Sequence, residues 1–227
     1  MSNLTQLSKT FLKLKNFQLL EILLHLKSFS QNNTYLVGGC VRNSLLGLEP
    51  KDFDIVTDVP LDDIIPVLKN NGWHVKEAGK QFLVVIATKN NNSFELANFR
   101  KEGSYLDGRR PSAVDIGTLE EDCLRRDLTI NSLYYDVFNN VVLDPSGFGL
   151  SDLDNKIIRF NGKAEERVKE DYLRVCRVYR FASVLNFSIE KKTLKACRIN
   201  FDTVLKTVSS ERVMSEIEKM VKSITCY

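Results

Sequence analysis

The sequence is poor in histidine and has no paired cysteines. Only two histidines occur among 227 residues, His25 and His74, which nearly excludes a histidine-based catalytic triad or a multi-histidine metal site. The five cysteines are odd in number, far apart and never in a C-x-x-C arrangement. Neither a zinc site nor a disulfide framework is therefore expected, and we predict mostly buried cysteines in a reducing compartment.

Long apolar runs are also missing. No stretch approaches the roughly 20 apolar residues that a membrane-spanning helix needs. The segment Leu4–Phe29 has apolar residues at helical spacing, but lysines and Glu21 interrupt it, and it lacks a secretory cleavage site. We expect a docked N-terminal helix within residues 1–30, no membrane partner and a cytoplasmic location. An organellar presequence stays open.

The overall composition is that of a globular protein. Apolar residues make up 43% and charged residues 27% of the chain, and this length suits one substantial domain or two small ones. A net charge of +3 permits a polyanionic partner but does not require one.

The order of local patterns predicts an α+β fold. Short apolar runs bounded by turn residues indicate strands, and 3.6-residue periodicity indicates helices. Before residue 150 we expect strands over 35–37, 51–57, 82–88, 94–99, 134–138 and 141–143, with helices over 40–46 and 61–71. The last two strands are expected to form a hairpin around Asn139–Asn140. A further helix is expected from Thr118 onward, where Glu121 three residues later completes the pattern of a capping box. From Glu165 the sequence is essentially helical. A mixed-sheet head over residues 31–150 and a helical neck over residues 151–227 are therefore predicted.

Two carboxylates stand out on the strand predicted over 51–57. Asp52 and Asp54 are at positions i and i+2, so both side chains point to one face of the strand. Adjacent carboxylates repel unless a cation lies between them. Mg²⁺ commonly takes one or two carboxylates and completes its shell with water and substrate phosphate. Solvated surface acids are the alternative explanation of the same pattern.

A glycine pair precedes these acids. Gly38 and Gly39 open the helix predicted over 40–46, and Arg42 follows within its first turn. Backbone N–H groups at a helix N-terminus bind phosphate oxygens well when no side chain obstructs them. An ordinary strand-to-helix turn explains the glycines equally well, but the nearby acids favour a phosphate site.

The stretch LVGGCVRNSLLGLEPKDFDIVTD resembles the first motif of class II tRNA nucleotidyltransferases, the family of CCA-adding enzymes and bacterial poly(A) polymerases. This resemblance implies a DNA polymerase beta-like head in which Asp52 and Asp54 hold two Mg²⁺ ions. By the same resemblance, Glu95 in FELANFR is a third catalytic acid. Asn43 replaces the family's usual aspartate after Arg42, so an ion pair at this position is expected to be lost.

A second family-like motif is Arg125–Asn131, RRDLTIN. The resemblance implies that Arg126 contacts the nucleotide. Asp127 and Asn131 are four residues apart on a predicted helix and are expected to brace the local structure.

The segment EDYLRVCRVYRFA, residues 170–182, carries a charged residue at every third position: Asp171, Arg174, Arg177 and Arg180. Apolar residues fill much of the remaining circumference, so we expect a well-buried helix. Buried arginines need anionic partners or a wet cleft. A structural salt-bridge network and a ligand-binding face both satisfy that need.

This segment is similar to the family's nucleotide-selecting motif, EDxLRxxRxxRF, which implies that Asp171 and Arg174 read the base. Cytosine and adenine both present an amino donor beside a ring-nitrogen acceptor. A carboxylate and a guanidinium match that pair with charge-assisted hydrogen bonds, whereas guanine and uracil leave unpaired groups. Arg177 and Arg180 are expected to meet the triphosphate or to brace the pocket.

The resemblance covers about residues 35–218 and includes GRRP at 108–111, LDP at 143–145 and ERV at 211–213. It implies a template-independent RNA 3′-end nucleotidyltransferase that adds C and/or A from CTP and ATP, with tRNA as the expected RNA. A poly(A) polymerase, a CC-adding or A-adding specialist and a non-enzymatic nucleotide- or RNA-binding head–neck remnant stay open. Because family members continue past the neck, we expect a partner subunit or dimer to supply RNA-binding surface.

Overall fold

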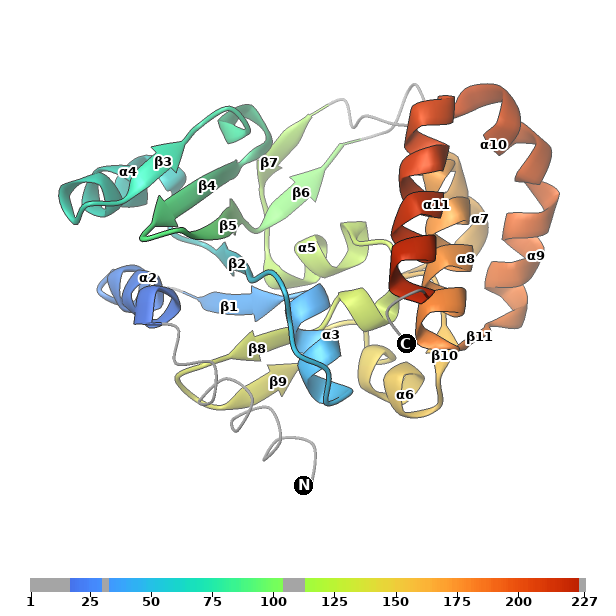
Figure 1. Cartoon of the computed structure of the whole chain (residues 1–227), viewed down its shortest axis with the longest axis horizontal. Coiled ribbons are helices and arrows are strands. Elements are labelled where there is room, and N and C mark those ends of the chain that lie inside the picture. The colour runs from blue at the N-terminus through green and yellow to red at the C-terminus, as the bar shows by residue number, and fades with distance from the viewer. Residues whose placement is uncertain (1–16, 30–32, 104–112, 225–227) are drawn as a thin grey trace. The chain divides into compact units, whose positions relative to one another are not determined.

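The computed structural model describes residues 17–29, 33–103 and 113–224 (Figure 1). Two compact units divide the chain: the sheet unit contains residues 1–101, 114–122 and 133–145, and the helical unit contains residues 102–113, 123–132 and 146–227. Residues 123–132 belong to the helical unit although they lie within the predicted head. The boundaries at residues 30 and 150 stay a prediction, because compactness alone does not define a domain.

A seven-stranded mixed sheet forms the centre of the sheet unit, as predicted. Its strand order is β3-β4-β5-β2-β1-β8-β9. The β2–β5 pair is parallel, and the neighbouring pairs β4–β5 and β1–β2 are antiparallel. The strands are β1 (Thr34–Val37), β2 (Asp54–Thr57), β3 (His74–Lys76), β4 (Val84–Lys89), β5 (Asn92–Asn98), β8 (Tyr134–Asp136) and β9 (Val141–Leu143).

Asparagines form the tight turns of this sheet. Asn90 and Asn91 join β4 to β5 with φ of 48° and 63°, and Asn140 before β9 has φ of 54°. Asparagine tolerates this left-handed conformation, which the two-residue turn between β4 and β5 requires. The hairpin predicted around Asn139–Asn140 is confirmed, with a four-residue turn over 137–140. The two strands predicted around the Asn90–Ser93 turn pair with each other.

Helices complete the sheet unit: α2 (Phe17–Lys27), α3 (Gly39–Leu45), α4 (Leu61–Asn70) and α5 (Leu119–Arg125), the last of which crosses into the helical unit. The helix expected near the N-terminus is described over α2, and residues 4–16 of that prediction lie outside the described residues. The Lys89 Nζ to Glu21 Oε1 ion pair of 2.6 Å fastens α2 to β4. Thr118 and Glu121 exchange side chain–backbone hydrogen bonds, which confirms the predicted capping box of α5.

The helical unit is built around α8 (Leu173–Leu185), which lies beside α11 (Ser210–Ile224) (Figure 1). Apolar side chains on α8, including Leu173, Val175, Val178 and Phe181, are buried. The other helices are α6 (Gly149–Asp154), α7 (Ala164–Glu170), α9 (Lys191–Ile199) and α10 (Phe201–Thr207). The helical prediction after residue 165 is thus confirmed, apart from a short strand at Ser188–Ile189.

Short elements connect the remaining segments. β6 (Arg100–Glu102) pairs with β7 (Val114–Ile116), and β10 (Ile157–Ile158) pairs with β11 (Ser188–Ile189). Two 3₁₀ turns, η1 (Lys80–Phe82) and η2 (Thr129–Asn131), complete the list. In the part of the chain that the structure describes, no helix combines the length and apolar character that a membrane crossing requires.

Candidate active site

Two of the predicted catalytic acids are neighbours across the central strands. Asp54 begins β2, and its partner in the parallel β2–β5 register is Glu95. Residues paired in this way place their side chains on the same face of a sheet. Asp54 is half-buried and Glu95 is exposed, so their carboxylates line an accessible face of the sheet unit.

Asp52 lies two residues before this pair. The predicted strand began at residue 51, whereas β2 begins at Asp54, so Asp52 precedes the regular ladder. Asp52 is exposed, Phe53 is buried and Asp54 is half-buried. This alternation fits an extended chain in which Asp52 and Asp54 share the face opposite Phe53.

The chemistry of these acids suits Mg²⁺, although they do not form a closed cage. Among the described residues, no group of three or more histidine, cysteine, aspartate or glutamate side chains is gathered as a metal cluster. Mg²⁺ does not require one, because it keeps several waters and takes its remaining oxygens from substrate phosphates. The assignment of Asp52 and Asp54 as Mg²⁺ ligands stays a prediction.

The glycine turn lies directly beside Asp54. Val37, the last residue of β1, pairs with Asp54 in the antiparallel register, and Gly38 follows as the N-cap of α3. Gly38 has φ of +78° and ψ of −126°, a conformation that favours glycine. Burial and the Asp54 charge raise the pKa of the neighbouring Cys40 thiol to about 12. The backbone of the Gly38 turn and the Asp54 carboxylate therefore lie at the same end of β1 and β2.

Arg42 is held inside α3. It is 8% exposed, and its Nε and Nη2 donate to Asn43 Oδ1 at 3.1 and 2.8 Å. Asn43 thus keeps a hydrogen-bonded contact with Arg42, but as a neutral acceptor. The predicted nucleotide-binding role of Arg42 stays a prediction.

The RRD segment of the helical unit is not a continuous helix, so this prediction was wrong. α5 ends at Arg125, Leu128 pairs with Phe160 in an isolated bridge, and η2 follows. The brace expected between Asp127 and Asn131 is nevertheless present, with Asn131 Nδ2 donating to Asp127 Oδ1 at 3.1 Å. The bends at residues 126 and 127, followed by the 3₁₀ turn η2, bring these two side chains together.

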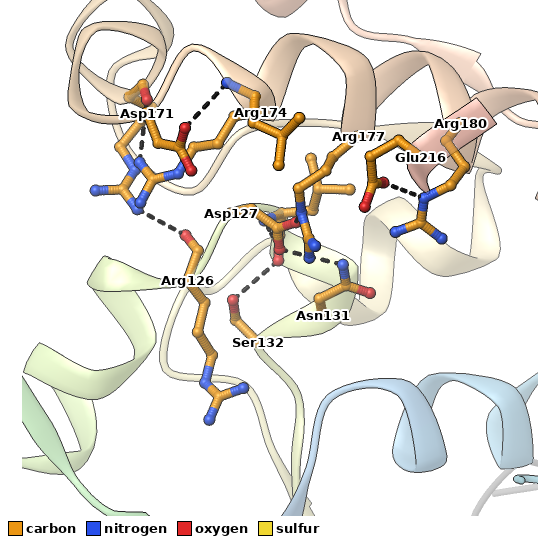
Figure 2. Close-up of polar contacts among 12 residues, drawn as sticks. Arg126, Asp127, Asn131, Ser132, Asp171, Arg174, Arg177, Arg180 and Glu216 are labelled. Carbon is orange, nitrogen blue, oxygen red and sulfur yellow. Dashed lines mark hydrogen bonds and ion pairs between the residues drawn. The ribbon is translucent and has the colours of Figure 1, made fainter. Parts of the chain in front are cut away.

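Asp127 also accepts a hydrogen bond from Arg177 Nε at 2.7 Å (Figure 2). Burial by itself would raise the pKa of the Asp127 carboxyl. The charge of Arg177 and hydrogen bonds from Asn131, Arg177 and the Leu128 backbone outweigh it and hold the pKa well below its usual range. The same attraction raises the pKa of Arg177. This ion pair joins α8 to the RRD segment.

Asp171 does not lie on the helix that carries the arginines, contrary to the prediction. α7 ends at Glu170 and α8 begins at Leu173, and Asp171 has extended backbone angles between them. Its Oδ1 accepts from the Leu173 N–H at 3.0 Å, which satisfies one free donor of the helix start. Of the two predicted base-reading residues, Asp171 therefore lies just before α8, and Arg174 lies in the first turn of α8.

Arg174 is 7% exposed and multiply bonded. Its guanidinium forms an ion pair with Glu170 and donates to the carbonyls of Arg167 and Arg125 at 3.0 and 3.2 Å. Arg167 donates to the Arg126 carbonyl at 2.9 Å. The buried side chains of Arg167 and Arg174 thus bind the carbonyls of Arg125 and Arg126. The side chain of Arg126 itself is half-buried and has contacts of its own.

Arg180 pairs with Glu216 of α11 (Figure 2) and lies 3.9 Å from the centre of the Phe181 ring. Glu216 is buried, and Lys219 also donates to it at 3.0 Å. Burial raises the pKa of Glu216, but Lys219 and Arg180 hold it below its usual value. The arginines of α8 therefore form a structural salt-bridge network, which is one of the two explanations that the sequence offered for them.

Comparison with known proteins adds the family. A model described as the poly A polymerase head domain matches residues 34–159, more than half of the chain. The chain belongs to this family. A second model, described as a probable RNA and SrmB-binding site of polymerase A, matches residues 186–225.

Curated relatives of this chain are CCA-adding enzymes. The chain is 39% identical over 188 residues to a CCA-adding enzyme of Streptococcus pyogenes serotype M2, covering 82% of this chain and 45% of the relative. It is 37% identical to a CCA-adding enzyme of Staphylococcus aureus, covering 84% of this chain and 46% of the relative. The chain therefore spans about half the length of the curated relatives it matches.

Solved structures agree with this assignment. The Bacillus stearothermophilus CCA-adding enzyme in complex with CTP superposes with a TM-score of 0.77 at 30% identity, over 89% of this chain and 47% of that one. A tRNA nucleotidyltransferase complexed with a primer tRNA and an incoming ATP analog gives a TM-score of 0.70 at 28% identity, over 86% and 56% of the two chains. The predicted fold class and family resemblance are confirmed.

Some contacts of this family member were not predicted from its sequence. Glu170, Arg167 and Glu216 pair with the arginine helix and its neighbours. Glu170 belongs to the EDYLR motif and offered a signal, whereas Glu216 lies 36 positions beyond Arg180 in an ordinary amphipathic helix. The family-like segment GRRP at 108–111 lies outside the described residues.

Proposed function

We propose that this chain is the catalytic and nucleotide-selecting part of a tRNA 3′-end nucleotidyltransferase. It would add C and/or A from CTP or ATP to a primer 3′ hydroxyl and release pyrophosphate. The observation that carries this proposal is the meeting of Asp54, Glu95 and the Gly38 turn at one end of the central strands. The family and the named substrates of its relatives support the same reaction.

Asp52 and Asp54 are the residues that would hold Mg²⁺. When bound, such ions supply activation of an attacking hydroxyl and charge stabilisation at the leaving pyrophosphate. Glu95, beside Asp54, would strengthen the negative field that retains a cation at this face. The Gly38 turn would leave the backbone of the α3 N-terminus open to phosphate oxygens.

Nucleotide selection would come from the start of α8. Asp171 would accept a hydrogen bond from the base amino group, and Arg174 would donate to the adjacent ring nitrogen. Arg174 already donates to Glu170 and two carbonyls, so only part of its guanidinium is left for a base. Arg126, Arg177 and Arg180 would bind phosphates or fix the pocket; the ion pairs of Arg177 and Arg180 favour the second role.

RNA binding has its own support in α9. Its cationic side chains Lys191, Lys192, Lys195 and Arg198 are exposed, and none forms an ion pair with a described residue. The helix lies within residues 186–225, the segment matched by the RNA-binding model. Cations that lack acidic partners are available to neutralise RNA phosphates.

A poly(A) polymerase is the second candidate, because the head-domain model carries that name. One experiment separates the candidates: incubation with Mg²⁺, tRNA ending before CCA, an unrelated RNA and each labelled nucleoside triphosphate. Incorporation of C and then A on the tRNA alone supports tRNA repair. Incorporation of C only or A only identifies a specialist, and long A tracts on either RNA support poly(A) synthesis. Binding of CTP without incorporation would leave a non-enzymatic head–neck remnant.

A further inference from the structure

The accessible face of β4 and β5 surrounds the predicted catalytic acid Glu95. In the antiparallel register, Glu95 pairs with Ile86, and Ser93 pairs with Thr88. Ile86 is 39% exposed. Ser93 and Glu95 are also exposed, and Thr88 is half-buried. The intervening residues of both strands point into the core: Val85, Ala87, Phe94 and Leu96. Ile86, Thr88, Ser93 and Glu95, the Glu95 patch, therefore share one open face of the sheet unit.

The Glu95 patch combines an apolar side chain with two hydroxyl groups. Thr88 Oγ1 and Ser93 Oγ lie 3.3 Å apart, within hydrogen-bonding distance. Each hydroxyl offers one donor and two acceptor sites, so the pair keeps one donor and about three acceptor sites after its mutual bond. Neither hydroxyl has another partner among the described residues. The pair can therefore both donate to and accept from a hydroxyl group of a ligand.

Strand order places the Glu95 patch on one side of Asp54 and the glycine turn on the other. β4 and β5 lie on one side of β2, and β1, which leads into the Gly38 turn, lies on the other (Figure 1). The proposed function puts the triphosphate at the Gly38 turn. In nucleotidyl transfer, the attacking hydroxyl and the leaving pyrophosphate lie on opposite sides of the α-phosphorus. The primer 3′ hydroxyl would therefore approach Asp54 from the side of the Glu95 patch.

The spacing of the Glu95 patch suits the last sugar of an RNA primer. Ser93 and Glu95 are two residues apart on one strand, which is about 7 Å along the chain. Their side chains can therefore reach the neighbouring 2′ and 3′ hydroxyls of one ribose. Ile86 lies directly across from Glu95 and offers an apolar surface to the sugar ring. The 2′ hydroxyl is both a donor and an acceptor, and it distinguishes RNA from DNA.

We propose that the Glu95 patch binds the terminal ribose of the RNA primer, with Ser93 and Thr88 recognising its 2′ hydroxyl and Ile86 packing against its ring. This inference rests on the proposed function and adds a specificity to it. A primer that ends in a ribonucleotide is preferred to one that ends in a 2′-deoxynucleotide. The preference is modest, because water can replace the missing 2′ oxygen at an exposed hydroxyl pair.

The test compares Ser93→Ala, the Ser93→Ala/Thr88→Val double variant and Ile86→Ala with the unaltered chain. Two tRNA primers ending before CCA differ only in the 2′ oxygen of the last nucleotide. Single-nucleotide incorporation from CTP gives kcat/KM for each primer, and fluorescence anisotropy gives their binding without turnover. Two exposed residues of the same unit provide matched controls, Ser28→Ala for the hydroxyls and Val141→Ala for the apolar side chain.

The double variant should lower the ribo-over-deoxy ratio of kcat/KM by roughly two- to tenfold, as expected for the loss of one neutral hydrogen bond. Ser93→Ala should fall between the double variant and the unaltered chain. Ile86→Ala should raise KM for both primers several-fold and leave KM for CTP unchanged, and both controls should keep the unaltered values. The CTP-over-dCTP ratio should stay constant in every variant, because the patch holds the primer and not the incoming nucleotide.

An unchanged ribo-over-deoxy ratio in both hydroxyl variants would overturn the proposal. A change in the CTP-over-dCTP ratio in its place would also overturn it, since the patch would then hold the incoming sugar. Lower thermal stability with equal losses for both primers would reduce the hydroxyl pair to a structural role.

Turnover by the unaltered chain without any primer preference contradicts the patch alone and leaves the proposed function intact. If the unaltered chain incorporates no nucleotide, the proposed function fails and anisotropy decides the inference. A preference for the ribo end that disappears in the double variant would then support the patch, and equal binding of both primers by the unaltered chain would refute it.

Discussion

The two units of this chain handle their charged residues differently. In the sheet unit, Asp52 and Glu95 are exposed, and neither forms an ion pair with a described residue. In the helical unit, Arg174, Arg177 and Arg180 each pair with an acid, and the acids Asp127 and Glu216 are buried. The candidate metal-site acids of the sheet unit are thus open to solvent, whereas the arginines of α8 are engaged in internal ion pairs.

This difference indicates how each unit would meet a nucleotide. Exposed, clustered acids are stabilised by a cation that arrives from solution. Paired arginines bind a ligand only through unused donors or by exchanging partners, and they otherwise fix the geometry around them. Removal of an acid from the sheet unit should therefore affect chemistry, and removal of an arginine from the helical unit should affect stability.

The largest effect is expected for Asp54→Asn. Loss of one carboxylate from a two-acid metal site should lower kcat/KM for CTP by about a thousandfold or more, equivalent to roughly 4 kcal/mol. The unfolding temperature should change little. Glu49→Gln, which removes an exposed acid near the same segment, is the control. Turnover of Asp54→Asn within tenfold of the unaltered chain would remove Asp54 from the site.

Arg177→Ala should act on stability. It leaves the buried Asp127 carboxylate without its cation and should destabilise the chain by about 2 kcal/mol, at the low end for such pairs because Arg177 keeps partial exposure. Urea denaturation measures this loss. The Arg177→Ala/Asp127→Asn double variant should recover part of it, and a loss equal to the sum of both single variants would show that the pair is not coupled.

The same pair predicts a pH dependence. The pKa of folded Asp127 lies below its unfolded value of 3.8. Its stabilising contribution is therefore complete above about pH 4 and is lost as pH falls through the folded pKa. Asp127→Asn should flatten the acid limb of stability against pH below about pH 4. An identical acid limb in both proteins would contradict the assignment.

A smaller effect is expected for the basic face of α9. The double change Lys191→Gln/Lys195→Gln should weaken tRNA binding several-fold and reduce the slope of log affinity against log salt by about 1.5, since each phosphate contact contributes roughly 0.7 to 0.9. Lys69→Gln/Lys76→Gln removes the same charge from the sheet unit and is the control. Equal slopes in both variants would exclude a specific α9 contact.

The smallest effect is expected for Asn43→Asp. An aspartate would turn the neutral contacts from Arg42 into charge-assisted ones and should stabilise the chain by up to about 1 kcal/mol. Thermal unfolding measures this gain, with Asn43→Ala as the opposite variant. A loss of stability in Asn43→Asp would mean that repulsion from the nearby acids outweighs the Arg42 pair.

Local patterns in the sequence determined most of the fold. The Asn139–Asn140 pair predicted a hairpin, the Thr118–Glu121 capping box predicted the start of α5, and short apolar runs predicted the strands. These features depend on neighbours along the chain. The shared orientation of Asp52 and Asp54 is likewise a local feature, because residues two apart in an extended chain point to the same side.

Tertiary structure alone decided which charges meet. The register of β2 against β5 places Glu95 beside Asp54. Bends at residues 126 and 127 interrupt the predicted helix, and Asp127 there pairs with Arg177, 50 residues away. Asp171 lies between α7 and α8, where its carboxylate accepts a hydrogen bond from the Leu173 N–H, and it also meets Arg212, 41 residues away. Periodicity cannot encode such partners, because the attraction between two charges depends on distance through space and not on separation along the chain.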